Sequence, residues 1–415
     1  MKFKTAFLAA TALVSAALVS AGAARAAELE VTHWWTSGGE AAAVAEFAKA
    51  FNATGNTWID GAIAGSGDTA RPIMVSRITG GDPMGATQFN HGRQAEELVA
   101  AGLMRDLDAV AEAENWKAVI NPPSLLDSCT LDGRIYCVPV NIHAWQWLWL
   151  SNKAFADAGV PVPTNWDEFV AAGPKLREAG KVPLALGQQS WQVTGLFNNL
   201  VLGLGGKDLY LKVYQDKDAE AAGGPEMARI FMAAADARDL SQGSNVQDWN
   251  QATNMVITDA AGGQSMGDWA QGEFQVANKV AGTDYTCLPG LGMPDAYLTT
   301  GGDSFYFPKL DDPEKSKAQE VLAKVMLSPE TQVAFNLKKG SMPVRGDIDL
   351  GAANDCMKKG LEILKAGRII KSTDELLSPD TTTQINDLMS QFFNDTSITP
   401  EDTQARFAEI IAAAD

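Results

Sequence analysis

The feature that most constrains the fold is a regular alternation of short β-prone runs and amphipathic helical runs after residue 28. The β-prone runs are rich in β-branched and aromatic residues, whereas the helical runs place apolar residues three and four positions apart. This alternation predicts an α/β fold in which a parallel sheet carries helices on both faces, with ligands bound beyond the carboxyl ends of the strands. The segments are a strand at 29–35, a helix at 41–51, a strand at 58–63, a helix at 71–78, a strand at 86–90 and a helix at 94–101.

The same alternation returns in the middle and at the end of the chain. A length of 415 residues predicts two or three domains, and no long linker separates them. Thr164 or Asn165 fits the N-cap of one of the later helices. The later segments are a strand at 144–150, a helix that opens within 162–169, a strand at 182–186 and helices at 225–238 and 399–414.

The first 26 residues have the pattern of an export signal. Lys2 and Lys4 precede an uncharged run at 5–22, and Ala24 and Ala26 place small residues at the two positions that a signal peptidase reads. A membrane anchor is the alternative, and the small-residue ending favours cleavage after Ala26. No Cys follows the apolar run, which is evidence against a lipid anchor. The sequence therefore predicts a protein that is free in the bacterial periplasm.

The charge balance and the missing motifs exclude several classes of function. The chain has 51 acidic and 33 basic residues, a net charge of −18, so it repels phosphate backbones and we expect no nucleic-acid partner. The three histidines have no metal-binding spacing, and dinucleotide and P-loop motifs are absent. We therefore expect no metal, no cofactor and no catalytic residue. The loop at 65–67 precedes a helix and could hold a small anion, although a lone motif of this kind is more often a simple turn.

Four cysteines agree with an oxidising compartment. Cys129 and Cys137 flank an Asp-Gly turn between two short β-prone runs, and a hairpin there brings their sulfurs together. Cys287 and Cys356 are then left to pair. Four free thiols are the alternative, which export makes less favourable.

Tryptophan is the other distinctive residue, with 11 Trp against six Tyr. Such heavy use predicts either core packing or a stacking surface. Trp145, Trp147 and Trp149 alternate along one expected strand and favour the core. Trp34 and Trp35 differ, because adjacent strand residues face opposite sides and one can pack while the other lines a crevice. Trp35 leads into a polar turn, which suits a polar, ring-shaped ligand such as a sugar.

Polar residues in glycine-rich surroundings supply the partners that sugar hydroxyls need. Asp268 and Trp269 form an aromatic–carboxylate pair, Asp303 follows two glycines, and Lys339 precedes another glycine. Each has a structural alternative, since Asp303 could cap a helix and Lys339 could be solvated. Taken together, they favour a binding site for a neutral sugar.

The order of these features resembles solute-binding protein family 1, the extracytoplasmic sugar-binding proteins of ABC importers, and within it the glucose/mannose-binding branch. The resemblance implies a type II periplasmic-binding-protein fold, whose two lobes are joined by three crossings and close on a sugar. It also implies a monomer that delivers the sugar to an ABC permease in the inner membrane. We expect one lobe from 27–138 with 292–340 and the other from 139–291 with 341–415. The matching stretches are 30–40, 129–139, 266–270, 302–303 and 339–345.

The same resemblance implies a set of ligand-facing residues. One departure matters: glucose binders of this branch use a histidine in the C-terminal third, whereas no histidine follows His143 here. Glu375 is our candidate to replace it, so the identity of the sugar stays open. The expected ligand-binding residues are Trp34, Trp35, Glu40, Gln88, Asn90, His91, Trp269, Asp303 and Lys339.

We therefore expect a binding protein without a catalytic step. The alternatives are a secreted glycan-active hydrolase, in which Glu40 and Asp303 form the acid/base pair, and a binder of another polar solute. If Asp303 serves only the ligand, Asp303→Ala should weaken sugar binding and leave the stability of the empty protein nearly unchanged.

Overall fold

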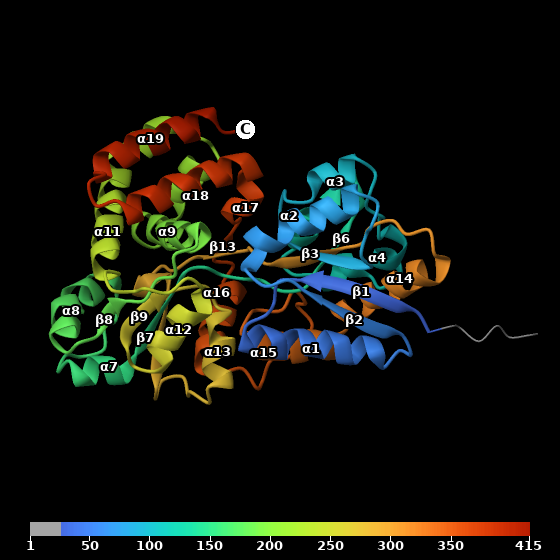
Figure 1. The fold of residues 1–415 in the computed structure, drawn as a ribbon, viewed down its shortest axis with the longest axis horizontal. Helices are drawn as coiled ribbons and strands as arrows, with labels where there is room; N and C mark the ends of the chain where they lie inside the picture. The colour runs from blue at the N-terminus through green and yellow to red at the C-terminus, as the bar shows by residue number, and fades with distance from the viewer. Residues whose placement is uncertain (1–25) are drawn as a thin grey trace, which may run out of the picture.

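The computed structural model describes residues 26–415, which form two bodies side by side (Figure 1). The predicted signal segment therefore lies outside the described residues, apart from residue 26. Within residues 26–415 no helix combines the length and apolar character needed to cross a membrane.

The strands form two main sheets and two small ones. The main sheets have the orders β2-β1-β3-β12-β6 and β10-β7-β9-β8, and the small ones pair β11 with β13 and β4 with β5. We call the bodies built on the two main sheets the first and the second lobe. The strands are β1 (Glu28–His33), β2 (Thr57–Ala62), β3 (Ala86–Asn90), β4 (Thr130–Leu131), β5 (Arg134–Ile135), β6 (Cys137–Pro139), β7 (Trp147–Ser151), β8 (Val182–Leu184), β9 (Ala261–Ser265), β10 (Tyr285–Pro289), β11 (Leu298–Thr299), β12 (Asp303–Tyr306) and β13 (Ile369–Ile370).

Helices cover both faces of each main sheet, and Figure 1 shows α1 on one side of the first sheet with α2 and α3 on the other. The helices are α1 (Gly38–Asn52), α2 (Ser66–Thr79), α3 (Glu96–Ala100), α4 (Asp108–Ala113), α5 (Trp116–Val119), α6 (Ser124–Asp127), α7 (Asn152–Asp157), α8 (Trp166–Glu178), α9 (Ser190–Tyr214), α10 (Ala219–Gly223), α11 (Pro225–Leu240), α12 (Trp249–Ile257), α13 (Ala270–Val276), α14 (Pro313–Leu327), α15 (Pro329–Lys339), α16 (Asp355–Lys365), α17 (Thr373–Leu376), α18 (Pro379–Asn394) and α19 (Pro400–Ala413). A 3₁₀ turn, η1, spans Gly290–Gly292.

The expectation of a purely parallel sheet is wrong for part of each lobe. In the first lobe β1 is parallel to β2 and β3, but β12 is antiparallel to both β3 and β6. In the second lobe β7 is antiparallel to β9 and β10. The strand β12 returns to the first sheet from the second lobe, so it enters from the opposite end, which a local pattern of strands and helices does not reveal.

Local signals predicted several elements well. Asn165 is the N-cap of α8, and its side chain accepts a hydrogen bond from the backbone N–H of Glu168. The expected strand at 144–150 begins only at Trp147. Trp147 and Trp149 are buried and stacked, with ring centroids 5.4 Å apart, so their assignment to the core is confirmed. Trp145 precedes the strand and has a different environment, described below.

Both predicted disulfides are present. Cys129 and Cys137 bridge the ends of the hairpin formed by β4 and β5, with Cα atoms 5.0 Å apart. Cys287 in β10 is bonded to Cys356 in α16, with Cα atoms 5.9 Å apart. The second bridge attaches the C-terminal part of the chain to the second lobe.

The chain passes between the two main sheets in the segments 140–146 and 290–302, and it passes to the second lobe again between Gly346, whose N–H donates to the carbonyl of Val119, and α16, which is disulfide-bonded to β10. The first segment contacts the other parts of the chain at this boundary, because the backbone of Ile142 bridges that of Met342, and His143 N–H donates to the carbonyl of Gly301. The boundaries expected at 138, 291 and 340 stay predictions. The strand β11 falls within the segment assigned to the first lobe, yet it pairs with β13 in a sheet of its own.

Beside the crossings, three glycines bring the lobes into direct backbone contact; we call them the glycine pivot. A Cβ on Gly39, in the first turn of α1, would lie 2.5 Å from the carbonyl carbon of Gly272 in α13. Gly340 ends α15 with a φ of 82°, and a Cβ there would lie 2.6 Å from Cβ of Gln271. Gly39 N–H also donates to Glu273 Oε1 at 2.7 Å. Side chains larger than hydrogen do not fit at these positions without displacement.

Candidate binding cleft between the lobes

A cavity of about 730 Å³ opens between the lobes, and residues from both of them line it. The first lobe contributes the ends of β1 and β3 and the start of α2, whereas the second contributes the starts of α9 and α12 and one face of α18. This volume lies within the range of about 300–1,000 Å³ typical of small-molecule sites.

Two buried charge clusters form what we call the floor of the cavity. In the first cluster, Lys339 Nζ lies 2.8 Å from Glu40 Oε1, and both side chains are almost fully buried. Ser37, the N-cap of α1, donates to the other oxygen of Glu40. The Lys339 ammonium also lies over the ring of Trp35, 5.6 Å from its centroid. Glu40 and Lys339 are 299 positions apart in sequence, and the packing of α1 against α15 brings them together.

The second cluster centres on His143, which lies in the first crossing segment. Its Nε2 is 2.7 Å from Asp303 Oδ2 in the first lobe, and its Nδ1 is 2.9 Å from Asp268 Oδ1 in the second. Asp303 also accepts from Gln88 Nε2 at 2.6 Å and from Asn141 Nδ2 at 3.0 Å. The imidazole therefore joins a carboxylate of each lobe.

The protonation of this cluster follows from its contacts. Burial alone would lower the pKa of His143, but the charge of Asp303 and the hydrogen bonds to both carboxylates raise it. Burial acts to raise the pKa of Asp303, yet the charge and hydrogen bond of His143, with Lys339, hold it well below its usual range. For Asp268 burial is the larger effect and the pKa is raised. The favoured state is an imidazolium paired with the Asp303 carboxylate.

The two adjacent tryptophans after β1 have different surroundings. Trp35 is buried among Phe305 and Phe335, with centroid distances of 5.6 and 5.2 Å, and touches the cavity only at its edge. Trp34 is half-buried in the cavity lining, with the guanidinium of Arg71 lying 5.7 Å from its centroid. Of the two, Trp34 presents the larger free surface to a ligand.

Four aromatic rings line the side of the cavity that belongs to the second lobe. Trp269 meets Trp145 edge to face at 4.7 Å, and Trp145 meets Trp191 at 5.5 Å. Trp249 lies on the far side of Trp269, at 6.4 Å. Indole faces and edges fixed in this way offer apolar contact to the C–H groups of a ring-shaped ligand.

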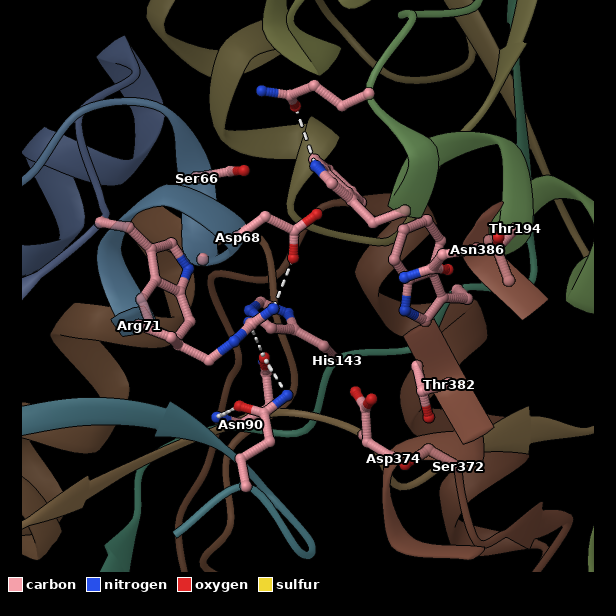
Figure 2. A pocket seen from close by; sticks show the side chains of 18 of the residues that line it. Ser66, Asp68, Arg71, Asn90, His143, Thr194, Ser372, Asp374, Thr382 and Asn386 are labelled. Atoms are coloured by element: carbon pink, nitrogen blue, oxygen red, sulfur yellow. Dashed lines mark hydrogen bonds and ion pairs between the residues drawn. The ribbon is translucent and has the colours of Figure 1, made fainter. Parts of the chain in front are cut away.

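The side of the cavity away from the floor, which we call the upper wall, carries polar groups from α2, α17 and α18 (Figure 2). Arg71 pairs with Asp68 at 2.5 Å and donates to Asn90 Oδ1 at 3.3 Å. Across from this group, the Asp374 carboxylate points into the cavity (Figure 2). The upper wall consists of Ser66, Asp68, Arg71, Asn90, Ser372, Asp374, Thr382 and Asn386.

Two buried hydroxyl oxygens at the cavity have no partner within residues 26–415. One belongs to Ser66, which sits in the 65–67 loop at a φ of 65°, and the other to the buried Thr194 in α9. A buried hydroxyl without a partner is costly, and both residues line the cavity. These groups are therefore free to bond to a ligand.

Seven of the nine expected ligand-binding residues line this cavity, and two do not. Gln88 instead donates to Asp303 and accepts from the backbone N–H of Trp34, so it positions both of them. His91 was expected to donate to the ligand, but it is fully buried with its ring nitrogens 3.1 and 3.0 Å from the carbonyl oxygens of Thr300 and Asp303. The seven lining residues are Trp34, Trp35, Glu40, Asn90, Trp269, Asp303 and Lys339.

The candidate replacement for the late histidine is also corrected. Glu375 accepts from the backbone and hydroxyl of Ser372, as in a capping box, and from the hydroxyl of Thr300, and it does not line the cavity. Its neighbour Asp374 does. In a single helical turn adjacent side chains diverge by about 100°, so the sequence alone could not choose between the two.

A sequence signal also marks other lining residues. Asp248 and Trp249 repeat the Asp-Trp pair found at 268–269, and both pairs stand near the start of a helix. Arg71 and Thr194 had none, because each lies in an ordinary helical run.

Comparison with known proteins identifies the family. The model for bacterial extracellular solute-binding proteins matches residues 35–333. The chain belongs to this family. A relative from Rhizobium meliloti (strain 1021), described as a probable sugar-binding periplasmic protein, is 39% identical over 357 residues and is aligned over 85% of both chains. A relative from Brucella suis with the same description is 38% identical over 359 residues, covering 86% of this chain and 84% of its own.

Solved structures share the two-lobed fold of this solute-binding family. The bacterial solute receptor AcbH, described as exclusive for β-D-galactopyranose, superposes with a TM-score of 0.75 at 20% identity, covering 93% of this chain and 98% of its own. An ABC transporter solute-binding protein from Thermotoga lettingae, bound with α-D-tagatose, gives 0.76 at 17% identity, covering 94% and 99%. At these identities the likeness shows the fold alone.

Proposed function

We propose that this protein is the periplasmic binding component of an ABC sugar importer, which takes a mono- or small oligosaccharide into the cleft between its lobes and delivers it to a membrane permease. The observation that carries the proposal is the cavity itself, where fixed indoles stand opposite hydroxyl-bonding groups. The sugar-binding descriptions of relatives at 37–39% identity support it.

Binding and closure are coupled in this proposal. A sugar that contacts both lobes binds the closed form more tightly than the open form, so its differential affinity shifts the population toward closure. The permease then recognises the closed arrangement of the two lobes. The crossing segments and the glycine pivot are the places about which the lobes rotate.

A hydrolase built on Glu40 and Asp303 is disfavoured by the charges around them. A glycosidase needs one carboxyl group that keeps its proton near neutral pH, and therefore a raised pKa. The pKa of Asp303 is instead lowered by His143, and Glu40 is paired with Lys339. Neither carboxyl group is placed to act as a general acid.

A thermal-shift and tryptophan-fluorescence screen of the mature protein against mono- and disaccharides tests the proposal. At a sugar concentration of about 100 times Kd, we expect stabilisation of about 2.7 kcal/mol and a change in indole emission. Amino acids, polyamines and sugar phosphates serve as comparison solutes. Stabilisation by one of these and by no sugar would overturn the proposal.

A further inference from the structure

Asp374 differs from every other carboxylate that lines the cavity. Glu40, Asp68 and Asp303 have cationic partners, while Asp248 caps the start of α12 and Asp387 is exposed at the mouth. Among residues 26–415, no donor bonds to the Asp374 carboxylate, which points into the cavity (Figure 2). An acceptor held in this way is available to a ligand.

The surroundings of Asp374 fix its position while leaving its carboxylate free. Its backbone carbonyl accepts from the N–H of Arg93 at 3.3 Å, and Gly92, with a φ of 113°, packs against its carbonyl group. The capping box of Ser372 and Glu375 holds the helical turn that carries it. Contacts from both lobes therefore fix the position of the Asp374 backbone.

The groups that face the carboxylate are mostly neutral or negative. On α2, the guanidinium of Arg71 is already paired with Asp68. On α18, Thr382 and Asn386 present uncharged side chains toward the same space (Figure 2). This part of the cavity therefore offers acceptors and a net negative charge.

We propose that Asp374 is the specificity-determining residue of the site: it accepts hydrogen bonds from sugar hydroxyl or ammonium groups and excludes sugars that carry a carboxylate or phosphate. This inference rests on the proposed sugar-binding function and names the class of sugar that the site takes. A hydroxyl donates to a charged acceptor more strongly than to a neutral one, whereas an acidic sugar brings a second negative charge into a half-buried space.

The protonation behaviour of the carboxyl group agrees with this role. Burial raises the pKa of Asp374 to about 6, with Glu375 and Asp68 adding to the shift and Arg71 opposing it. Tyr210, whose ring also lines the cavity, has a pKa raised far above its ordinary value by burial and stays neutral. A donor from the ligand would stabilise the carboxylate where the protein supplies none.

The test uses calorimetric titration of the full mature protein at pH 7.5 with matched sugars. For glucose, galactose and mannose, the neutral sugar, its 2-amino derivative and its uronate are compared in the wild type, Asp374→Asn and Asp374→Thr. Asp380→Asn is the control, because it removes the same charge from an exposed position of α18 that does not line the cavity. Melting temperatures verify that each variant is folded.

We expect the wild type to bind a neutral or amino sugar at least 100-fold more tightly than the matching uronate. Both Asp374 variants should lower the affinity for the neutral sugar at least tenfold and should reduce the ratio of neutral-sugar affinity to uronate affinity. Asp380→Asn should change neither the affinity nor the ratio by more than twofold. If the wild type binds a sugar and the Asp374 variants bind it equally well, the inference fails and the proposed function stands. If no sugar in the wider screen binds the wild type, both fail.

Discussion

The floor and the upper wall of the cavity both carry polar and charged residues, but they differ in whether these residues are paired within the protein. On the floor, Glu40, Asp303 and Lys339 are almost fully buried and each one is paired within the protein. On the upper wall, Asp374 and the hydroxyl of Ser66 have no partner among residues 26–415. The Glu40–Lys339 pair joins α1 to α15 within the first lobe, and Asp303 joins that lobe to His143 in a crossing segment. The unpaired groups of the upper wall still have hydrogen-bonding capacity to offer. Position in the cavity alone therefore does not make a residue a ligand contact.

The largest expected effect is on the floor. Asp303→Ala removes the acceptor of Gln88, Asn141 and His143, and breaking a buried ion pair costs about 3–5 kcal/mol. We expect a loss of this size in the free energy of unfolding of the empty protein, measured in urea. This replaces the expectation from the sequence that the empty protein would be unaffected. An unchanged unfolding curve would show that Asp303, like Asp374, contributes little to the stability of the empty protein. The floor and the upper wall would then not differ in this respect.

A smaller loss is expected behind the floor, at the glycine pivot. Gly39→Ala forces a methyl group against the backbone of Gly272, and overpacking of this kind costs about 1–3 kcal/mol. Gly38→Ala is the matched control, since its methyl group would lie 3.6 Å from its nearest neighbours. Urea unfolding should separate the two neighbouring variants. Equal free energies of unfolding for Gly39→Ala and Gly38→Ala would show that α1 and α13 can move apart without loss of stability.

On the upper wall we expect a substitution to raise the free energy of unfolding, whereas the substitutions on the floor and at the pivot lower it. The folded-state pKa of Asp374, about 6, lies above its ordinary value of about 3.9, so the folded protein binds the extra proton and loses stability as pH rises between these values. Asp374→Asn should therefore be more stable than the wild type at pH 7.5. The gain cannot exceed about 3 kcal/mol, and we expect about 1 kcal/mol because the side chain is half-buried.

Melting curves from pH 4 to pH 8 measure this difference. It should shrink as pH falls through 6 and be small at pH 4, where the carboxyl group is protonated in the folded state and about half protonated in the unfolded state. A destabilised Asp374→Asn at pH 7.5 would mean that the carboxylate is structural after all.

The smallest effect concerns a single hydroxyl. Thr194→Val keeps the shape of the side chain and removes a hydroxyl that has no partner, so the unfolding free energy should stay within about 0.5 kcal/mol. Sugar affinity, measured by calorimetry, should fall between about twofold and tenfold. Thr253→Val is the control: its hydroxyl bonds to Trp249 and Gln264, so it should lose stability rather than affinity.

The sequence predicted the elements that local signals define. The turn between Cys129 and Cys137, an N-cap at Thr164 or Asn165 and the different surroundings of Trp34 and Trp35 all follow from neighbouring residues, although β1 ends at His33 and not at the expected residue 35. The roles of polar residues did not follow in the same way. Whether Asp303 bonds to a sugar or to His143 depends on which segments meet at the crossings, 160 positions apart in the chain.

The resemblance to a known family placed several distant residues in one cavity, but it could not divide them into structural and ligand-facing groups. His91 is the clearest example, since its expected role as a donor ignored the two carbonyl groups that surround it. Asp374 is the converse, because only the fold shows that it faces the cavity while Glu375 faces the crossing segment.

The glycine pivot also has a mechanical consequence. Figure 1 shows α1, α13 and α15 at one edge of the gap between the lobes, with α2 and α17 at the opposite edge. For a rigid rotation about the pivot, displacement grows with distance from the axis, so Glu40 and Lys339, which adjoin Gly39 and Gly340, travel least. In the closure proposed above, the Glu40–Lys339 pair therefore stays assembled, and Asp374, at the opposite edge, undergoes the largest displacement relative to the first lobe.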